Sequence, residues 1–192
     1  MPVKFIANIT GQSSLLQALA LSLFLLTTHA QAEKFSEDQI KAVFLFNFAT
    51  FIRWPDDAFI ATDTPFHFCA LTDQTPIIQS LIQVISGESH QGRKLVFKLI
   101  KPLDDLNMDD VSTCQILFFH PQELEQFSLL VQALSQFRIL TVSDAENFIE
   151  KGGMVALIHT DHRLRPMIHN KRLQQSGLKA SSKLLQLAKI VE

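Results

Sequence analysis

The chain has 192 residues, of which 47% are hydrophobic and 19% are charged, and its formal net charge is −2. This many apolar side chains exclude intrinsic disorder, and one globular domain is expected. The basic residues are not clustered, so the charge footprint of a nucleic-acid-binding protein is missing. The two Cys are too few for a disulfide scaffold or a Cys-rich zinc domain, and the lack of Tyr excludes a phenolic proton donor.

The first 32 residues have the layout of a secretory signal peptide. Lys4 is their only charge, and an apolar stretch from about Leu15 to Leu26 precedes the small-residue triplet Ala30-Gln31-Ala32. This stretch is too short to span a bilayer as a helix, which takes about 20 residues. We expect cleavage after Ala32 and export of residues 33–192 as a single domain, to a compartment where disulfides persist. An uncleaved membrane anchor is the alternative.

The first predicted element of the exported chain is an amphipathic helix that begins after Ser36 and ends before Trp54-Pro55. Ser36 and Gln39 have the spacing of a capping box, and the residue before a proline is disfavoured in a helix. The apolar residues at helical spacing between them are Ile40, Val43, Phe44, Phe48, Phe51 and Ile52. Phe46 falls off this face, which makes it a candidate partner-binding residue.

Strands and helices then alternate along the chain. The predicted order is a strand over 66–71, a helix over 76–86, strands over 94–100 and 115–119, a helix over 121–135, a strand over 139–142, a short helix over 144–151, hairpin strands over 154–159 and 165–169, and a helix over 181–192. This order predicts an α/β layered domain that ends in a hairpin and a helix. We expect its sheet to be largely parallel, with helices on both faces.

The sequence lacks the motifs of the common enzyme classes. Its six glycines cannot assemble a G-x-G-x-x-G fingerprint or a P-loop, and there is no G-x-S-x-G turn for a hydrolase serine. His159 and His162, with Asp161 between them, are candidate zinc or copper ligands, but a polar hairpin turn is the favoured interpretation. The spacing of a calcium loop is not met by Asp104, Asp105, Asp109 and Asp110. We therefore expect no catalytic residue, no metal site and no cofactor.

The two cysteines are predicted to form a disulfide. Cys69 lies in the first predicted strand and Cys114 at the entrance to the third. In a doubly wound sheet of order 2-1-3 these strands are neighbours, and their Cα atoms can approach the ~5.5 Å that a disulfide needs. In the chain-entropy model a disulfide that closes this loop contributes about 4 kcal/mol. Two buried free thiols are the alternative.

Four segments together resemble one family: KAVFLFNFATFIRWP, ILTVSDAENFIEKGGMVALI, RLRPMIHN and SGLKASSKLLQLAKIV. On these segments the chain is similar to the YfiR-like periplasmic proteins, from about Ile40 to Val191. The resemblance implies a Rossmann-like sandwich. It also implies a non-enzymatic repressor that binds the periplasmic sensor domain of an inner-membrane diguanylate cyclase and keeps cyclic-di-GMP low. Cys69 and Cys114 fall where the family commonly has a strand-borne pair, whereas a second, late Cys pair is absent here.

The third segment carries the candidate ligand-binding residues. The family's hairpin commonly ends in R-x-R-F-x-I-N, and here Pro166 replaces the aromatic residue and His169 the amide. Arg163 and Arg165 alternate on one strand and so share a face. The resemblance implies small-molecule binding near this strand, and paired guanidinium groups can clamp a carboxylate or phosphate. A solvated strand edge is the alternative for this pair, and Arg53 is a further candidate for the same pocket.

Two functions remain open at this point. The first is a periplasmic regulator that represses a membrane-bound signalling enzyme, with a diguanylate cyclase as the expected partner. The second is a periplasmic protein that binds a small anionic ligand and serves a sensor kinase or another receptor. No nucleic-acid partner is expected, and a homodimer is left open.

Overall fold

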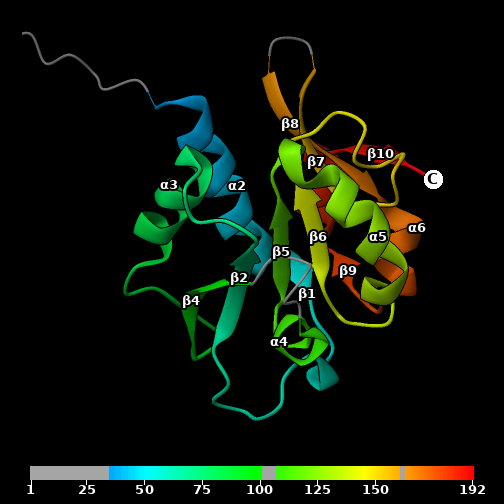
Figure 1. Ribbon diagram of the computed structural model, residues 1–192. Coiled ribbons are helices and arrows are strands. Elements are labelled where there is room, and N and C mark those ends of the chain that lie inside the picture. Colours follow the sequence, from blue (N-terminus) through cyan, green and yellow to red (C-terminus); the bar gives the residue numbers. More distant parts are fainter. Residues whose placement is uncertain (1–34, 101–106, 161–162) are drawn as a thin grey trace, which may run out of the picture. The chain divides into compact units, whose positions relative to one another are not determined.

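A central eight-stranded sheet runs through the residues that the computed structural model describes, which are 35–100, 107–160 and 163–192 (Figure 1). From edge to edge its strands are β10 (Lys189–Val191), β8 (Arg163–His169), β7 (Val155–Thr160), β6 (Leu140–Ser143), β5 (Ile116–Phe119), β2 (Phe66–Ala70), β4 (Arg93–Leu99) and β3 (Ser89–His90). The predicted signal peptide lies outside the described residues, as do Asp104, Asp105, Asp161 and His162.

The sheet is largely parallel, as predicted. The neighbours β4, β2, β5, β6 and β7 all run in one direction, while β7–β8 and β3–β4 pair antiparallel. In chain order the first three long strands are β2, β4 and β5, and β2 lies between the other two. The predicted 2-1-3 strand order is therefore confirmed.

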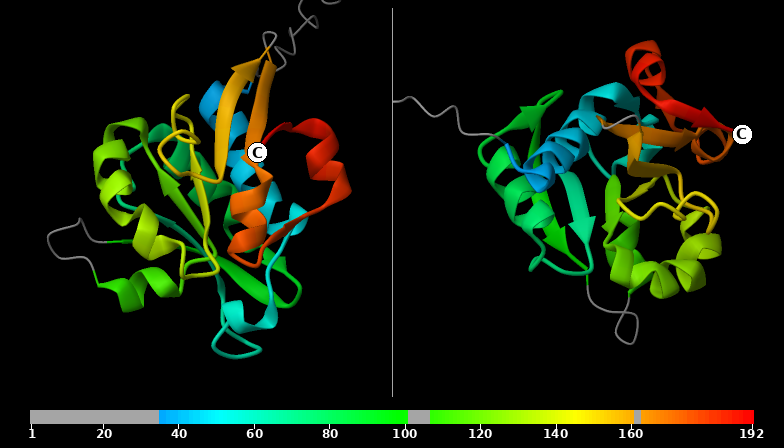
Figure 2. Two further views of the ribbon diagram at one scale, coloured as in Figure 1. Left: turned by 90° about the vertical axis from the view of Figure 1, so that its right-hand side faces the viewer. Right: turned by 90° about the horizontal axis from the view of Figure 1, so that it is seen from above.

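Helices cover both faces of this sheet. One face carries α2 (Glu37–Phe51) and α3 (Pro76–Ile85), and the other carries α4 (Met108–Ser112) and α5 (Leu124–Leu134) (Figure 2). Strand β5 is apolar throughout because both of its faces are covered. Its side chains alternate between the faces, so Ile116 and Phe118 belong to one core cluster and Leu117 and Phe119 belong to the other. The predicted α/β sandwich is confirmed.

Helix α2 begins as its capping box predicts, but it buries a different stripe. The Ser36 hydroxyl accepts a hydrogen bond from the Gln39 amide, and the Gln39 side chain accepts one from the Ser36 amide. The fully buried residues of the helix are Ala42, Leu45, Phe48 and Ala49. Ile40 and Val43, predicted to face the core, are instead 40% and 41% exposed.

The chain between β6 and β7 was predicted to form a short helix over 144–151, and this prediction is wrong. Its backbone hydrogen bonds span three, four, three and five residues in turn, and the last runs from the Gly153 amide to the Phe148 carbonyl. The segment is a series of turns that buries the Phe148 ring against Phe127, with 4.5 Å between the ring centroids. Core packing of this aromatic side chain overrides the local helical pattern.

The C-terminal segment also differs from the predicted long helix. Helices α6 (Asn170–Gln175) and α7 (Ser182–Leu187) are short, and the chain ends in the edge strand β10. A second, two-stranded ribbon joins β1 (Ile52–Arg53), which follows α2, to β9 (Lys179–Ala180). Among the helices described, none has the length and hydropathy needed to cross a membrane.

Candidate functional site

The two cysteines form a disulfide between neighbouring strands. Cys69 in β2 bonds to Cys114, just before β5, with the Cα atoms 5.9 Å apart. The residues are 2% and 1% exposed and belong to the core cluster beneath α5. This is the pairing that the strand order predicts, and its burial places it among the structural elements of the fold.

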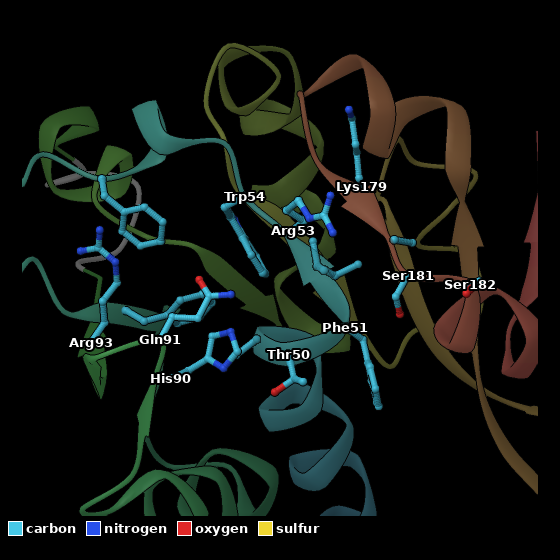
Figure 3. A pocket seen from close by; sticks show the side chains of 15 residues that line it. Thr50, Phe51, Arg53, Trp54, His90, Gln91, Arg93, Lys179, Ser181 and Ser182 are labelled. Atoms are coloured by element: carbon cyan, nitrogen blue, oxygen red, sulfur yellow. The ribbon is translucent and has the colours of Figure 1, made fainter. Parts of the chain in front are cut away.

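A cavity with a volume of about 430 Å³ lies at the amino-terminal edge of the parallel strands (Figure 3). We call it the amino-edge pocket. Phe66 begins β2 and Arg93 begins β4, and both line it. The full lining is Ala49, Thr50, Phe51, Ile52, Arg53, Trp54, Phe59, Phe66, His90, Gln91, Arg93, Lys179, Ala180, Ser181 and Ser182.

Two of the basic residues in this lining are direct cross-strand partners. In the β1–β9 ribbon Arg53 pairs with Lys179, and the preceding Ile52 pairs with Ala180. Opposite residues of an antiparallel pair project to the same face, so the two cations share one side of the ribbon. Ile52 is buried whereas Arg53 and Lys179 are exposed, and all four residues of the ribbon line the pocket.

The aromatic wall of the pocket is held by contacts of its own. The Trp54 ring packs edge-to-face on Phe66, with 5.0 Å between centroids, and its Nε1 donates to the Arg138 carbonyl. The Arg93 guanidinium lies 3.9 Å from the centroid of the Phe59 ring and donates to the carbonyls of Ala61 and Thr64. Figure 3 shows the Trp54 ring between Arg53 on one side and Gln91 and Arg93 on the other.

His90 adds a neutral polar group to the same pocket. Burial lowers the pKa of this imidazole below its ordinary value, because a charged ring loses solvation there. His90 is therefore uncharged at neutral pH and can donate or accept a hydrogen bond.

A second cavity, of about 270 Å³, lies between α2, the start of β8 and α7. We call it the hairpin groove. Its apolar lining comes from Phe44, Leu164, Pro166 and Leu187, and its polar lining from Arg163, Arg165 and Gln186. Strand β10 pairs with β8 only from Met167 onward, so the edge of β8 at Arg163 to Pro166 is open in the described part of the chain.

The structure divides the predicted ligand-binding residues among three places. Arg163 and Arg165 lie together in the hairpin groove, whereas Arg53 lines the amino-edge pocket. His169 ends β8, and its Nδ1 accepts the Arg172 amide at the start of α6. Burial, followed by the nearby Arg172 charge, lowers the pKa of His169. The predicted single pocket is therefore not formed by these four residues.

The predicted partner-binding residue Phe46 is half-buried and packs against the core cluster beneath α2. The exposed apolar residues of this helix are Ile40 and Val43 instead. The sequence does not predict that Lys179 and His90 line the amino-edge pocket. Each lies in a strand of two residues, which is too short to produce a periodic pattern.

Among the described residues no group of three His, Cys, Asp or Glu side chains is arranged to hold a metal ion. His67 and His120 are engaged in the fold: the His67 ring contacts the Thr113 carbonyl, and the His120 ring accepts the Gln122 amide. The chemistry available at both cavities is thus the binding of anions and of apolar surface.

Comparison with known proteins gives one family for the chain. The family model described as YfiR/HmsC-like matches residues 38–189, which include α2 except its first residue, strands β1 to β9, and the residues that line both cavities. A search of curated proteins gives no significant match. The match is consistent with a periplasmic regulator of diguanylate cyclases, a role that is regulatory and not catalytic. The chain belongs to the YfiR/HmsC-like family.

Proposed function

We propose that this protein is an exported periplasmic regulator. It binds the periplasmic sensor domain of an inner-membrane diguanylate cyclase and lowers the output of cyclic-di-GMP. The observation that carries the proposal is the family match over residues 38–189. The signal-peptide pattern of residues 1–32 supports export, with cleavage after Ala32.

An exposed apolar surface beside the hairpin groove supports a protein partner. Ile40, Val43 and Phe44 lie one helical turn or less apart on α2, and Phe44 and Leu187 line the groove together. Ile40, Val43 and Leu187 are 40%, 41% and 59% exposed. We call Ile40, Val43, Phe44 and Leu187 the α2 surface.

Charge placement around this surface fits the anatomy of a protein interface. Arg163 and Arg165 line the groove beside Phe44 and Leu187. Interfaces combine an apolar centre with a polar rim and are enriched in arginine, which contributes both stem packing and hydrogen bonds. We propose that the sensor domain covers the α2 surface and that Arg163 and Arg165 pair with its acidic or carbonyl groups.

The experiment is a measurement of cyclic-di-GMP in cells that carry the intact gene, a deletion, or single variants. Val43→Asp and Leu187→Asp place a charge in the α2 surface and are expected to raise cyclic-di-GMP to the level of the deletion. Leu129→Asp is the matched control, because Leu129 is 76% exposed on α5, the helix that covers the other face of the sheet. This control is expected to keep repression.

Unchanged cyclic-di-GMP in the deletion strain under every growth condition would contradict the proposal. If the deletion raises cyclic-di-GMP but both aspartate variants still repress fully, the regulator stands and the α2 surface is wrong as its docking site. Self-association of the purified chain that Val43→Asp abolishes would assign this surface to a homodimer instead.

A further inference from the structure

A third cavity, of about 290 Å³, is lined by the two helices α5 and α6 (Figure 1). We call it the α5–α6 pocket. Helix α5 supplies Val131 and Leu134, the chain between β6 and β7 supplies Gly152 and Met154, and α6 supplies Arg172. None of its lining residues lines the amino-edge pocket or the hairpin groove, so it is a separate site.

The walls of the α5–α6 pocket are apolar and closely joined. Leu134 and Met154 are 1% and 6% exposed, and Val131 is half-buried beside them. A Cβ on Gly152 would stand 2.6 Å from a methyl carbon of Val131, so the chain between β6 and β7 passes directly against α5. The cavity therefore offers a small molecule an apolar surface from which water gains little.

Arg172 is the one charged residue in this lining. Its Nη1 donates to the carbonyls of Ile149 and Gly153, which holds the guanidinium against the chain between β6 and β7. The hydroxyl of Thr141 accepts a backbone amide and that of Ser176 donates to a backbone carbonyl, so both are already engaged. Within the described residues, Nε and Nη2 of Arg172 make no hydrogen bond and the side chain forms no ion pair.

The free edge of this guanidinium is suited to a carboxylate. Burial lowers the pKa of Arg172 from its ordinary value, because the charge loses solvation there. The side chain still stays charged at neutral pH. Nε–H and Nη2–H point in parallel from a planar group, and a carboxylate can accept both at once in a bidentate pair. Such a pair would compensate the lost solvation.

We infer that the α5–α6 pocket binds a small apolar molecule that ends in a carboxylate. The apolar part lies against Val131, Leu134 and Met154, and the carboxylate accepts from Nε and Nη2 of Arg172. The volume is close to the lower end of the range for small-molecule sites, about 300 Å³, which fits one such molecule and excludes a helix of a partner protein. This inference does not depend on the proposed diguanylate cyclase partner.

The test is calorimetric titration of the purified protein with octanoate and with N-acetylleucine, which distinguish an alkyl acid from a blocked apolar amino acid. At least one of them is expected to bind. Acetate lacks the apolar part and octanol lacks the charge, so each should bind about tenfold more weakly or worse. In methyl NMR spectra the bound probe should shift the signal of Met154, which Met154→Leu assigns.

Two variants remove different parts of the site. Arg172→Gln should weaken binding of the carboxylate about tenfold or more, because it removes a charge-assisted pair. Ser135→Phe keeps Arg172 and places a ring over the cavity from the exposed end of α5, so it should abolish binding. Lys171→Gln is the matched control: this neighbouring cation on α6 is exposed and does not line the pocket, and its loss should leave the affinity unchanged.

The outcomes separate a built site from general attraction to the protein. The inference is overturned if neither carboxylate binds, if octanol binds as tightly as octanoate, or if the bound probe leaves the Met154 signal unmoved. It is also overturned if Ser135→Phe binds as the parent does. Because Arg172 also holds two backbone carbonyls, circular dichroism checks the fold of Arg172→Gln. If that variant does not fold, Ser135→Phe and the comparison with octanol decide.

Discussion

The Lys41 ammonium lies 2.9 Å from the Asp144 carboxylate and ties helix α2 to the end of strand β6. The two side chains are only 11% and 12% exposed, and the second Asp144 oxygen, Oδ1, is buried with no hydrogen-bond partner among the described residues. Lys41 also contacts Glu37, 2.8 Å away, and Glu37 in turn lies 3.1 Å from His159 in β7. These contacts join α2 to two strands of the sheet.

Replacing Lys41 by Met should destabilise the fold strongly, because it leaves the Asp144 carboxylate buried without its cation. We expect a loss of about 2–4 kcal/mol in the free energy of unfolding, below the full value for a completely buried pair. The neighbouring Glu37→Gln is the control: Glu37 is 50% exposed, so its loss should change stability by at most about 1 kcal/mol. Urea unfolding of the three proteins measures both. Equal losses in the two variants would show that Asp144 does not need Lys41.

The same cluster predicts a window of pH over which it stabilises the fold. Hydrogen bonds from Lys41 and then His159 lower the pKa of Glu37 from its ordinary value of 4.5, so the stability it contributes is present above this value and is lost as pH falls through the lower, folded pKa. Burial opposes the charge of Lys41, but its hydrogen bonds to Glu37 and Asp144 outweigh burial and raise its pKa above 10.5.

Because a raised lysine pKa stabilises the fold below its unfolded value, the Lys41 contribution is lost as pH rises through the folded pKa, above 10.5. The difference in Tm between the parent and Glu37→Gln should therefore be present at neutral pH and should shrink in acid, as pH falls from 4.5 through the lower, folded pKa of Glu37. Thermal unfolding across pH 3–8 measures it. A difference that persists at the acid end would mean that the Glu37 side chain acts by packing and not by charge.

The Cys69–Cys114 disulfide is predicted to be structural. It closes a loop of 45 residues, for which the chain-entropy model gives about 4 kcal/mol. Because both cysteines are almost fully buried, a reductant can reach the bond only through local or global unfolding. We expect dithiothreitol to leave the folded protein oxidised and to reduce it rapidly in denaturant, with mass spectrometry of alkylated thiols as the measurement. Rapid reduction without denaturant would indicate an accessible, redox-responsive bond.

The sequence predicted best where local pattern and tertiary environment agree. The capping box of Ser36, the apolar run from Ile116 to Phe119 and the order of the parallel strands all follow from residues close together in the chain or from general rules of α/β sheets. The short ribbon and the final strand were missed because each is only two or three residues long and depends on a distant partner: Arg53 on Lys179, and β10 on β8.

The candidate sites were also predictable only where a local sequence pattern decides which residues lie together. Alternation placed Arg163 and Arg165 together correctly, since it is a property of a single strand. Grouping Arg53 with them required knowing where the end of α2 lies, which is fixed by packing of Ala42, Leu45 and Phe48 and not by any signal near Arg53. The same packing decides which side of α2 is buried. Phe46, predicted to be exposed, is therefore half-buried, and the exposed apolar residues are Ile40 and Val43.

Two glycines, Gly87 before β3 and Gly153 after β6, differ in what a side chain would meet. A Cβ on Gly153 would overlap the ring of Phe148, which is buried in the core, whereas a Cβ on Gly87 would meet open space. Gly153→Ala should therefore cost about 1–3 kcal/mol through overpacking. Gly87→Ala should cost about 1 kcal/mol, through its positive φ of 78° alone. Chemical unfolding of both variants tests this order, and a Gly87 variant that is the less stable of the two would contradict it.

The like-charge pair of the β1–β9 ribbon predicts a substitution that stabilises the protein. Lys179→Glu places a carboxylate opposite Arg53 and turns cross-strand repulsion into attraction, which should raise the free energy of unfolding by about 0.5–1 kcal/mol at low salt. Lys189→Glu is the matched control, because Lys189 is also an exposed lysine on a short strand but its cross-strand neighbour is Met167.

We expect no gain from this control, and we expect the gain from Lys179→Glu to shrink as salt screens the pair. Thermal unfolding at about 0.02 M and 0.5 M salt measures both effects. A destabilised Lys179→Glu protein would mean that Lys179 already has a favourable partner and that Arg53 and Lys179 do not repel each other in the ribbon.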